Sequence, residues 1–465
     1  MNSKILQLHE EIISNKTTVE DLVEKAITAS NACPSASLAF NTNTLRDIEH
    51  AKKDSKKTNL LFGIPYSLKD LYSTKHIVTT AGSLILKDYV PSYNATVFDR
   101  LISSGAILIS KTNLDEFGMG GTGLSSAYKP IINPFNEEKI VGGSSSGAAV
   151  QIALGAVPFA LGTDTGDSVR TPASYMGIVG FKPTYGAISK YGVIPFAPSL
   201  DTVGINAKHV VDVAIVAHAI SGVDEKDCNT IDIEFSSEVA KVDKINITII
   251  DGIEAYLPAH EKEIYLNNVA ILSKKFNVVK KQFDLKYIEA ISAVYMVIAY
   301  SEASSTFSNF NGVSFGNVNE NSEYEKRVSN FRSKGFADKV KRLLIIGASC
   351  LDEENYENVF IKAKKVRAVL RNEFNKLLEG SDCLITPSHS MFASTKETLM
   401  NGSFNGPENW YAADLLNLAN FAGAPSITIP TYCHKDENFG ININGKSGTD
   451  KAILDIAYTL EDLFI

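Results

Sequence analysis

Two glycine- and serine-rich segments, residues 141–147 and 162–170, constrain the fold of this chain more than any other part of its sequence. Only a short apolar helix, predicted over residues 148–154, and a short strand, predicted over residues 157–161, separate them. Glycine allows backbone conformations and close approaches that other residues resist, and hydroxyl-bearing loops on a rigid frame often bind or react. The sequence therefore predicts a helix and a strand that hold two functional loops near each other.

Helix and strand patterns also alternate on both sides of these segments. Residues 64–69 alternate apolar and polar side chains, and a helix that ends at Gly105 leads into a buried strand over residues 106–109. Further strands are predicted at residues 245–250, 277–283, 383–386, 426–430 and 440–444. Such alternation is typical of sheets covered by helices. We therefore expect an α/β fold with a large mixed, mostly parallel central sheet and helices on both faces.

We expect residues 1–465 to form a single domain, because no proline- or glycine-rich linker divides the chain. Two helices within residues 1–30 should pack on this domain, and the second should open with a capping box at residues 17–20. Residues 112–117 are predicted to start another helix. The polar segment 309–334 has few apolar residues and is predicted to be a loop or mobile surface.

Composition excludes several classes of protein. The net charge of −8 argues against nucleic-acid binding through broad electrostatics. The five cysteines are scattered and form no Cys-x-x-Cys pair, so neither a zinc site nor disulfides are expected. No run approaches the roughly 18 apolar residues that span a bilayer, and no signal sequence is recognisable. We therefore expect no metal, no membrane contact and a cytoplasmic location.

The first glycine-rich segment allows two interpretations from its own residues. A phosphate-binding loop would need a Gly-Lys-Ser/Thr ending or a Gly-x-Gly-x-x-Gly pattern, and neither is present. Residues 143–147 do fit Gly-x-Ser-x-Gly with Ser145 in the centre, but a nucleophile elbow follows a strand and requires a histidine. The histidines available are His209, His218 and His389. None of them stands in a recognisable catalytic context.

A third interpretation combines both segments with Lys69. The chain resembles the amidase signature family in a set of motifs that keep the family's order. The matching motifs lie at residues 63–70, 142–145, 162–170, 180–184 and 199–204. The resemblance runs from the N-terminal helices to the last strand and implies the amidase signature fold. It also implies a Ser–cis-Ser–Lys triad, with Ser168 as the nucleophile, Ser144 as the bridging serine on a cis peptide bond and Lys69 as the base.

The implied triad is chemically sound. A serine hydroxyl needs a base, and a lysine can serve only if burial lowers its pKa enough to leave the amine neutral. Ser144 would then relay a proton between Lys69 and Ser168. The resemblance also implies an oxyanion hole formed by the N–H groups of Thr165, Gly166, Asp167 and Ser168.

Within the family, other segments resemble the A subunits of glutamyl-tRNA(Gln) amidotransferases. They lie at residues 115–120, 220–224, 301–305, 411–416 and 423–425. This resemblance implies a glutaminase whose ammonia passes to a B subunit, which uses ATP and magnesium to convert Glu-tRNA(Gln) to Gln-tRNA(Gln). A small C subunit would brace the pair. The implied partners are thus the B and C subunits, glutamine and, mainly through the B subunit, Glu-tRNA(Gln), and no cofactor is implied for this chain itself.

The resemblance further implies contacts with glutamine. Asp414 would hold its α-amino group, Arg342 its α-carboxylate and Tyr295 one side of its pocket. Ser145 would be a further substrate contact. From the residues alone, Asp414 could instead be an ordinary carboxylate at a helix start, and Arg342 could be part of a solvated helix face.

The chain also departs from the family pattern. Asp167 and Ser146 stand where the family has glycines, and the family's paired arginines correspond to Arg342 and Leu343. Asp167 adds a carboxylate beside the oxyanion and tolerates a positive φ less readily than glycine. Three hypotheses therefore remain: the chain is a glutaminase within a larger complex, or a stand-alone amidase for another amide, or a catalytically impaired scaffold.

Overall fold

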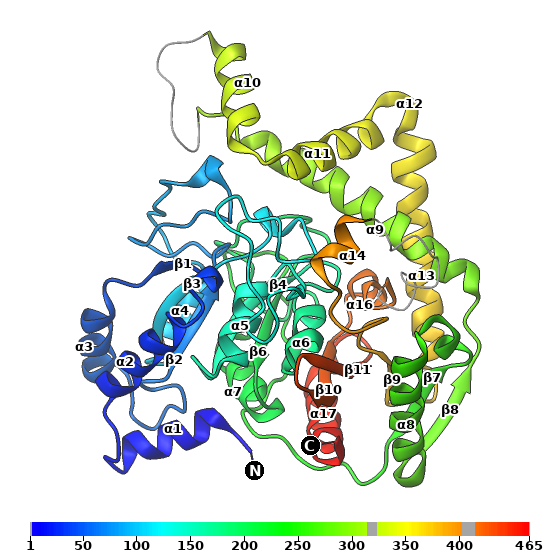
Figure 1. Cartoon of the computed structure of the whole chain (residues 1–465), viewed down its shortest axis with the longest axis horizontal. Coiled ribbons are helices and arrows are strands. Elements are labelled where there is room, and N and C mark those ends of the chain that lie inside the picture. Colours follow the sequence, from blue (N-terminus) through cyan, green and yellow to red (C-terminus); the bar gives the residue numbers. More distant parts are fainter. Residues whose placement is uncertain (1, 314–322, 402–413, 465) are drawn as a thin grey trace.

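One sheet of eleven strands forms the centre of the computed structural model, which describes residues 2–313, 323–401 and 414–464 (Figure 1). The strands are β1 Ser37–Phe40, β2 Pro65–Lys69, β3 Ile107–Thr112, β4 Phe159–Asp164, β5 Val179–Lys182, β6 Thr202–Ala207, β7 Asn246–Ile250, β8 Asn277–Lys281, β9 Cys383–Pro387, β10 Ser426–His434 and β11 Glu437–Asn444. Their order across the sheet is β1-β3-β2-β4-β6-β5-β10-β11-β9-β7-β8. The C-terminal strands β10 and β11 therefore lie in the interior of the sheet.

Helices connect and cover these strands. They are α1 Lys4–Ile13, α2 Val19–Ser30, α3 Thr44–Asp54, α4 Thr96–Ser103, α5 Ser146–Ala153, α6 Arg170–Met176, α7 Val210–Ile220, α8 Ala259–Lys275, α9 Leu285–Thr306, α10 Tyr324–Gly335, α11 Asp338–Leu351, α12 Glu353–Asn355, α13 Lys362–Leu377, α14 Lys396–Met400, α16 Asn417–Ala422 and α17 Asp450–Phe464. Within the described ranges, none of the helices is both long and apolar enough to cross a membrane.

The sheet is mixed, as expected, but parallel pairs do not dominate it. Among the described strands the parallel pairs are β2–β3, β2–β4, β7–β8 and β7–β9. The antiparallel pairs are β1–β3, β4–β6, β5–β6, β5–β10, β10–β11 and β9–β11. The alternation of helix and strand did not reveal the reversals. One of them is the tight β10–β11 hairpin, which turns at Lys435 with a φ of 57°.

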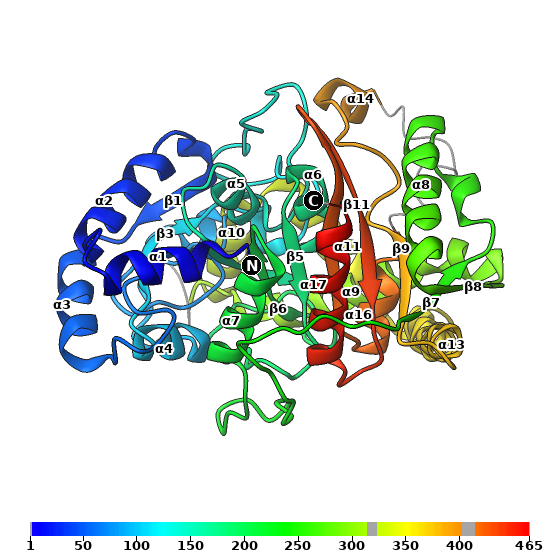
Figure 2. The same ribbon diagram turned by 90° about the horizontal axis from the view of Figure 1, so that it is seen from below.

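Helices cover both faces of the sheet. Successive side chains of β4 point to opposite faces. Phe159 and Leu161 lie in the apolar cluster that contains α7 and α17, whereas Ala160 lies in the cluster that contains α5. Figure 2 shows α5 and α6 on one side of the strands and α4 and α7 on the other. The helical cover on both faces is thus confirmed.

The capping box of α2 lies one residue later than predicted. The N–H of Asp21 donates to Thr18 Oγ1 at 3.1 Å, and the N–H of Thr18 donates to Asp21 Oδ2 at 3.2 Å. Glu20, the acidic partner in the predicted box, instead pairs with Lys52 of α3. The box therefore uses the aspartate at the third helical position.

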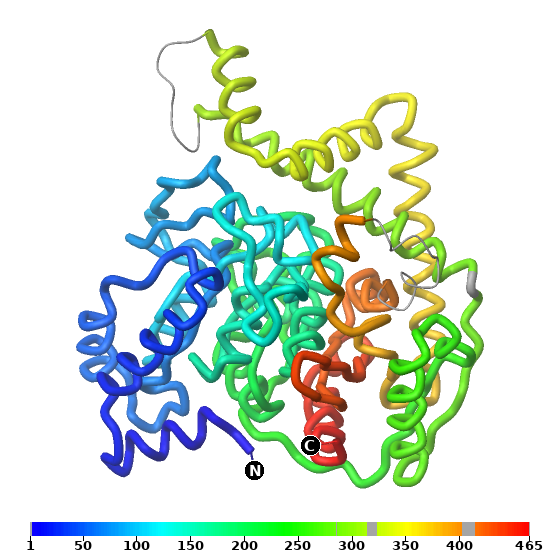
Figure 3. Tube along the Cα trace, in the orientation of Figure 1, coloured from blue at the N-terminus to red at the C-terminus, as the bar shows by residue number. Residues whose placement is uncertain are grey.

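The N-terminal helix α1 is fastened to α7. Asp212 of α7 accepts the Ser3 hydroxyl at 2.5 Å and the N–H of Ile5 at 2.9 Å, so its charge lies at the positive end of α1. Ile5 and Leu8 are buried in the same apolar cluster as α7 and α17. Both chain ends consequently lie on the same side of the molecule (Figure 3).

Three helical segments differ from the sequence predictions. Residues 324–335 form α10, so the predicted loop is wrong in that part. The predicted helix at 112–117 is also wrong, because this stretch ends β3 and leads into a single turn at Glu116–Gly118, with Phe117 at a φ of 55°. No helix was predicted where α9 lies, although Ile288, Ile291 and Ile298 are buried at helical spacing.

The contact between α9 and α11 depends on one glycine. A Cβ added to Gly347 of α11 would lie 1.9 Å from the carbonyl oxygen of Tyr300 in α9, so the two backbones touch there. Gly347→Ala should therefore force the helices apart and lower the free energy of unfolding by about 1–3 kcal/mol. Thermal unfolding of the pure protein measures this loss of stability. Ser349→Ala on the exposed side of α11 is the control, and an equal effect of both changes would contradict the close-contact interpretation.

Candidate active site

Separate elements bring Lys69, Ser144 and Ser168 to one edge of the sheet. Lys69 is the last residue of β2, and Ser168 follows β4, the parallel neighbour of β2. Parallel neighbours end at the same edge, so both residues lie beyond the carboxyl ends of their strands. Ser144 lies just before α5, and the N–H of Ser145 donates to the Ser168 carbonyl at 3.1 Å. The two glycine-rich segments therefore meet, as the sequence predicts.

The Lys69 amine is completely buried among hydroxyl groups. Its Nζ lies 2.9 Å from Ser144 Oγ, and 3.0 Å and 2.9 Å from the hydroxyl oxygens of Ser145 and Thr163. Within the described part of the chain, no carboxylate lies within ion-pair distance of this amine. Burial lowers the pKa of Lys69 to about 7, against the opposing pull of more distant carboxylates. An amine with this pKa is largely neutral just above pH 7, which a base requires.

Ser145 lies on the Lys69 side of this arrangement. Its hydroxyl accepts from the Lys69 amine and from the N–H of Thr163 at 3.2 Å, and it donates to the Thr163 carbonyl at 3.1 Å. The side chain is fully buried. These contacts let Ser145 position Lys69, and the substrate contact that the family resemblance implied stays a prediction.

The peptide bond between Gly143 and Ser144 is cis, as the family resemblance implied. Asp115 supports this turn from behind. A Cβ on Gly143 would lie 2.1 Å from Asp115 Oδ2, so only glycine fits there. The Asp115 carboxylate also accepts the N–H groups of Gly123 at 3.0 Å and Ser125 at 2.8 Å. Asp115 therefore orders the neighbouring loop against the bridging serine, a role that the sequence analysis did not assign.

The loop from Thr165 to Ser168 presents backbone N–H groups with no internal partner. Among the described residues, none of these N–H groups donates a hydrogen bond. The Thr165 hydroxyl donates to Asp201 at 2.7 Å, which fixes the start of the loop. A Cβ on Gly166 would meet Asn417 Oδ1 at 2.5 Å. Free N–H groups on a fixed loop are what an oxyanion hole requires.

Arg170 clamps this loop to distant parts of the chain. It is fully buried and forms two hydrogen bonds with the Asp164 carboxylate, at 3.0 Å and 2.9 Å. Its remaining N–H groups reach the carbonyls of Gly166 at 2.6 Å and Leu416 at 2.9 Å, and the hydroxyl of Ser426 at 3.0 Å. Sequence reasoning assigned no role to Arg170. The sequence signal for this role was the pair of Asp164 and Arg170 within one glycine-rich motif, because a buried arginine requires an acidic partner.

Asp167 and Ser146, which replace glycines of the family pattern, are both accommodated by the structure. Asp167 does not have a positive φ, so its backbone needs no glycine. Its carboxylate accepts the Thr171 hydroxyl at 2.7 Å, and burial raises the pKa of Asp167 to about 6. The Ser146 hydroxyl donates to the Gly142 carbonyl at 2.5 Å. Both side chains therefore form hydrogen bonds with neighbouring groups.

The residues implied for glutamine binding divide into two groups. Tyr295 and Asn417 lie beside the nucleophile loop, because a Cβ on Gly166 would be 3.0 Å from the Tyr295 ring and 2.5 Å from Asn417 Oδ1. Asn417 also donates to the Asp414 carbonyl at 3.2 Å. The pKa of Asp414 is raised to about 7, mainly by burial and in part by the charge of Asp167. Arg342 is exposed on α11. Its exposed position on a helix is what the alternative interpretation describes, and its contact with the glutamine carboxylate stays a prediction.

The histidine-dependent interpretation has no support in the structure. His389 contacts Tyr175 Oη at 2.9 Å, His218 contacts the Phe235 carbonyl at 3.0 Å, and His209 pairs with Glu461 at 3.4 Å. Ser145 has no histidine partner among the described residues. In those same residues, no three His, Cys, Asp or Glu side chains are placed to hold a metal ion.

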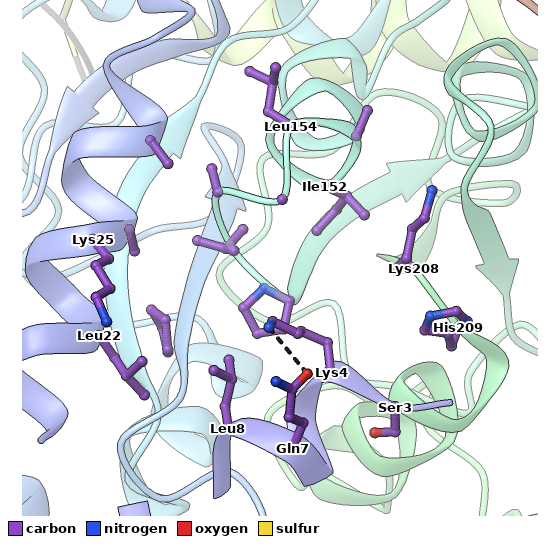
Figure 4. A pocket seen from close by; sticks show the side chains of 18 of the residues that line it. Ser3, Lys4, Gln7, Leu8, Leu22, Lys25, Ile152, Leu154, Lys208 and His209 are labelled. Atoms are coloured by element: carbon purple, nitrogen blue, oxygen red, sulfur yellow. Dashed lines mark hydrogen bonds between the residues drawn. The ribbon is translucent and has the colours of Figure 1, made fainter. Parts of the chain in front are cut away.

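A separate cavity of about 780 Å³ lies at the other end of β4. α1, α2 and the residues that lead into β4 line it, and Figure 4 shows Lys25 and Lys208 on opposite sides. It lies before Phe159, whereas Ser168 follows Asp164 at the far end of the strand. This cavity is therefore not part of the catalytic site.

The lowered pKa of Lys69 predicts how the reactivity of Ser168 depends on pH. The rate of labelling by a sulfonyl fluoride should rise roughly tenfold per pH unit below about 7 and level off above it, because only the neutral amine accepts the proton. Mass spectrometry of the labelled peptide measures the rate. Lys69→Met should remove the pH dependence, and Ser168→Ala should remove the label. Labelling that persists in Ser168→Ala would contradict the assignment.

Comparisons with known proteins agree with this geometry. The Amidase family model matches residues 17–454. The chain is 40% identical to the A subunit of glutamyl-tRNA(Gln) amidotransferase from Mycoplasma genitalium, over 100% of this chain and 99% of that protein, and 36% identical to the protein of the same name from Sulfurihydrogenibium, over 98% and 93%. The crystal structure of the corresponding protein from Thermotoga maritima superposes with a TM-score of 0.76 at 31% identity, covering 96% of this chain and 94% of that one. This chain therefore belongs to the amidase family.

Proposed function

We propose that this chain is the glutamine-hydrolysing component of a glutamyl-tRNA(Gln) amidotransferase. The observation that carries the proposal is the contact between Lys69 and Ser144 beside the Ser168 loop, whose N–H groups are available for an oxyanion. The similarity over the full length to proteins named as the A subunits of such enzymes supports glutamine as the amide.

The proposed reaction uses residues of this chain only. Ser168 Oγ attacks the side-chain amide carbon of glutamine, its proton passes to Ser144, and the Ser144 proton passes to neutral Lys69. The free N–H groups of the nucleophile loop stabilise the oxyanion that forms. The proton then returns through Ser144 to the leaving nitrogen, so that ammonia departs and a γ-glutamyl ester remains. Water attacks this ester by the same proton route and releases glutamate.

The partners follow from the same proposal. A B subunit would use ATP and magnesium to activate Glu-tRNA(Gln) and accept the ammonia, and a C subunit would support the complex. The complex would act in the cytoplasm, where aminoacylated tRNA is used. This chain would contribute neither the nucleotide site nor the metal site.

The scaffold hypothesis gains no support from the site. It rests on Asp167, but that residue has no positive φ and its carboxylate is bound by Thr171. A stand-alone amidase remains an outcome of the test below.

The decisive experiment uses the chain assembled with its partner subunits. The wild type should release glutamate from glutamine, and Ser168→Ala should lower that release by about 1,000-fold or more, because the attacking hydroxyl is lost. The variant complex should still amidate Glu-tRNA(Gln) with free ammonia, since the partner reaction does not use Ser168.

Two results would contradict the proposal. Glutamate release that survives in Ser168→Ala would remove the nucleophile assignment. Rapid turnover of another amide by the isolated chain, with no glutamine hydrolysis in the assembled complex, would identify a stand-alone amidase.

A further inference from the structure

The turn formed by residues 196–201 holds the start of the nucleophile loop. Asp201 accepts the Thr165 hydroxyl at 2.7 Å, and both residues are buried. The same carboxylate accepts the N–H groups of Phe196 at 2.8 Å and of Ala197 at 3.0 Å, which closes the turn on itself. The shape of this turn therefore sets where Thr165 lies, and with it the backbone N–H groups that follow.

Ser199, within this turn, is held by charged side chains from two helices. Glu302 of α9 accepts the Ser199 hydroxyl at 2.6 Å and the Ser199 N–H at 2.9 Å. Arg367 of α13 donates to Ser199 Oγ at 2.9 Å and to the Ser199 carbonyl at 3.1 Å. Hydrogen bonds to ionised groups are roughly twice as strong as those between neutral groups. The serine is thus fixed through its N–H, its hydroxyl and its carbonyl at once.

Arg367 also reaches the other side of the nucleophile loop. Its Nε donates to the Phe421 carbonyl of α16 at 3.4 Å. The same helix carries Asn417, whose Oδ1 would lie 2.5 Å from a Cβ on Gly166. α13 packs against both α9 and α16. One guanidinium group therefore joins the turn that holds Thr165 to the helix that touches Gly166.

We propose that Glu302 and Arg367 are positioning residues that hold the nucleophile loop in the geometry required for amide cleavage. They fix Ser199, and Asp201 passes this constraint to the loop. The inference rests on the proposed hydrolytic function and gives a role to two motifs, at residues 199–204 and 301–305, that the catalytic assignment does not use. An oxyanion forms only during the reaction, so loss of these contacts should slow the chemical step and leave substrate binding unchanged.

The test is the steady-state kinetics of glutamine hydrolysis by the assembled complex. Glu302→Gln replaces one acceptor oxygen by a donor, so one of the two bonds to Ser199 is lost. We expect kcat to fall roughly 10-fold or more and KM to change by no more than about twofold, because small displacements of a catalytic group have large effects on rate. Arg367→Lys keeps the charge but not the forked contact, and should have the same effect.

Two control variants make the same exchanges on exposed side chains of the same helices, Glu289→Gln on α9 and Arg371→Lys on α13. Both should leave kcat and KM within about twofold of the wild type. The fraction of chains that a sulfonyl fluoride labels at Ser168 counts the intact sites. If Glu302→Gln lowers kcat only in proportion to this fraction, the residue only stabilises the fold and the inference is overturned.

Thr165→Val tests whether the effect passes through Asp201. Valine has nearly the shape of threonine but lacks the hydroxyl that Asp201 binds. If Glu302 acts through this bond, the double variant should be no more than about twofold slower than the slower single variant. If the two effects multiply instead, Glu302 acts on a different group and the proposed route is wrong.

The two proposals can fail separately, because labelling of Ser168 by a sulfonyl fluoride needs no glutamine. The same loop would stabilise the charge that develops on the sulfonyl oxygens. If the wild-type complex does not hydrolyse glutamine but Glu302→Gln still slows labelling roughly 10-fold, the proposed function fails and the positioning role stands. If glutamine is hydrolysed and Glu302→Gln leaves kcat unchanged, the function stands and the positioning role fails.

Discussion

The chemistry of this protein depends on keeping one buried lysine without an ion-pair partner. A carboxylate in contact with Lys69 would hold its amine in the charged form, and a charged amine cannot accept a proton. The surrounding carboxylates are engaged by other donors. Asp164 binds Arg170, Asp115 binds backbone N–H groups, and Asp201 binds Thr165 and the N–H of Phe196 at 2.8 Å. The hydroxyl groups around Lys69 and these engaged carboxylates together favour the neutral amine that the proposed base requires.

The support for this arrangement reaches far from the catalytic residues. Asp115 orders the loop beside the bridging serine, and the next residue, Glu116, accepts the N–H of Ala337 at 3.1 Å, just before α11. Lys339 of α11 donates to Ser125 Oγ at 3.0 Å. The helices between β8 and β9 are thus joined directly to the wall of the site. The shared sheet and these contacts connect the two ends of the molecule.

The parts of the site that could be predicted from sequence are those where the backbone has to be glycine or a side chain has to be reactive. Lys69, Ser144 and Ser168 stand in such motifs, and the structure brings their segments together. The role of Arg342 stays a prediction, because its neighbours Lys339 and Lys341 indicate a helix face but not which way that face points. The supporting roles of Arg170 and Asn417 depend on partners more than 200 residues away, a relationship that local patterns do not contain. The antiparallel strand pairs could not be predicted for a related reason. Which strands become neighbours depends on the whole sheet and not on the residues of one strand.

The clamp formed by Arg170 also has a consequence for the order of assembly during synthesis. Two of its partners, the Leu416 carbonyl and the Ser426 hydroxyl, lie near the C-terminal end of the chain. The strand that carries Ser426 also inserts between β5 and β11 in the interior of the sheet. A nascent chain that already contains Ser144 and Ser168 therefore still lacks two of the groups that hold Arg170. The contacts that complete the Arg170 cluster can form only after nearly the whole polypeptide has been made.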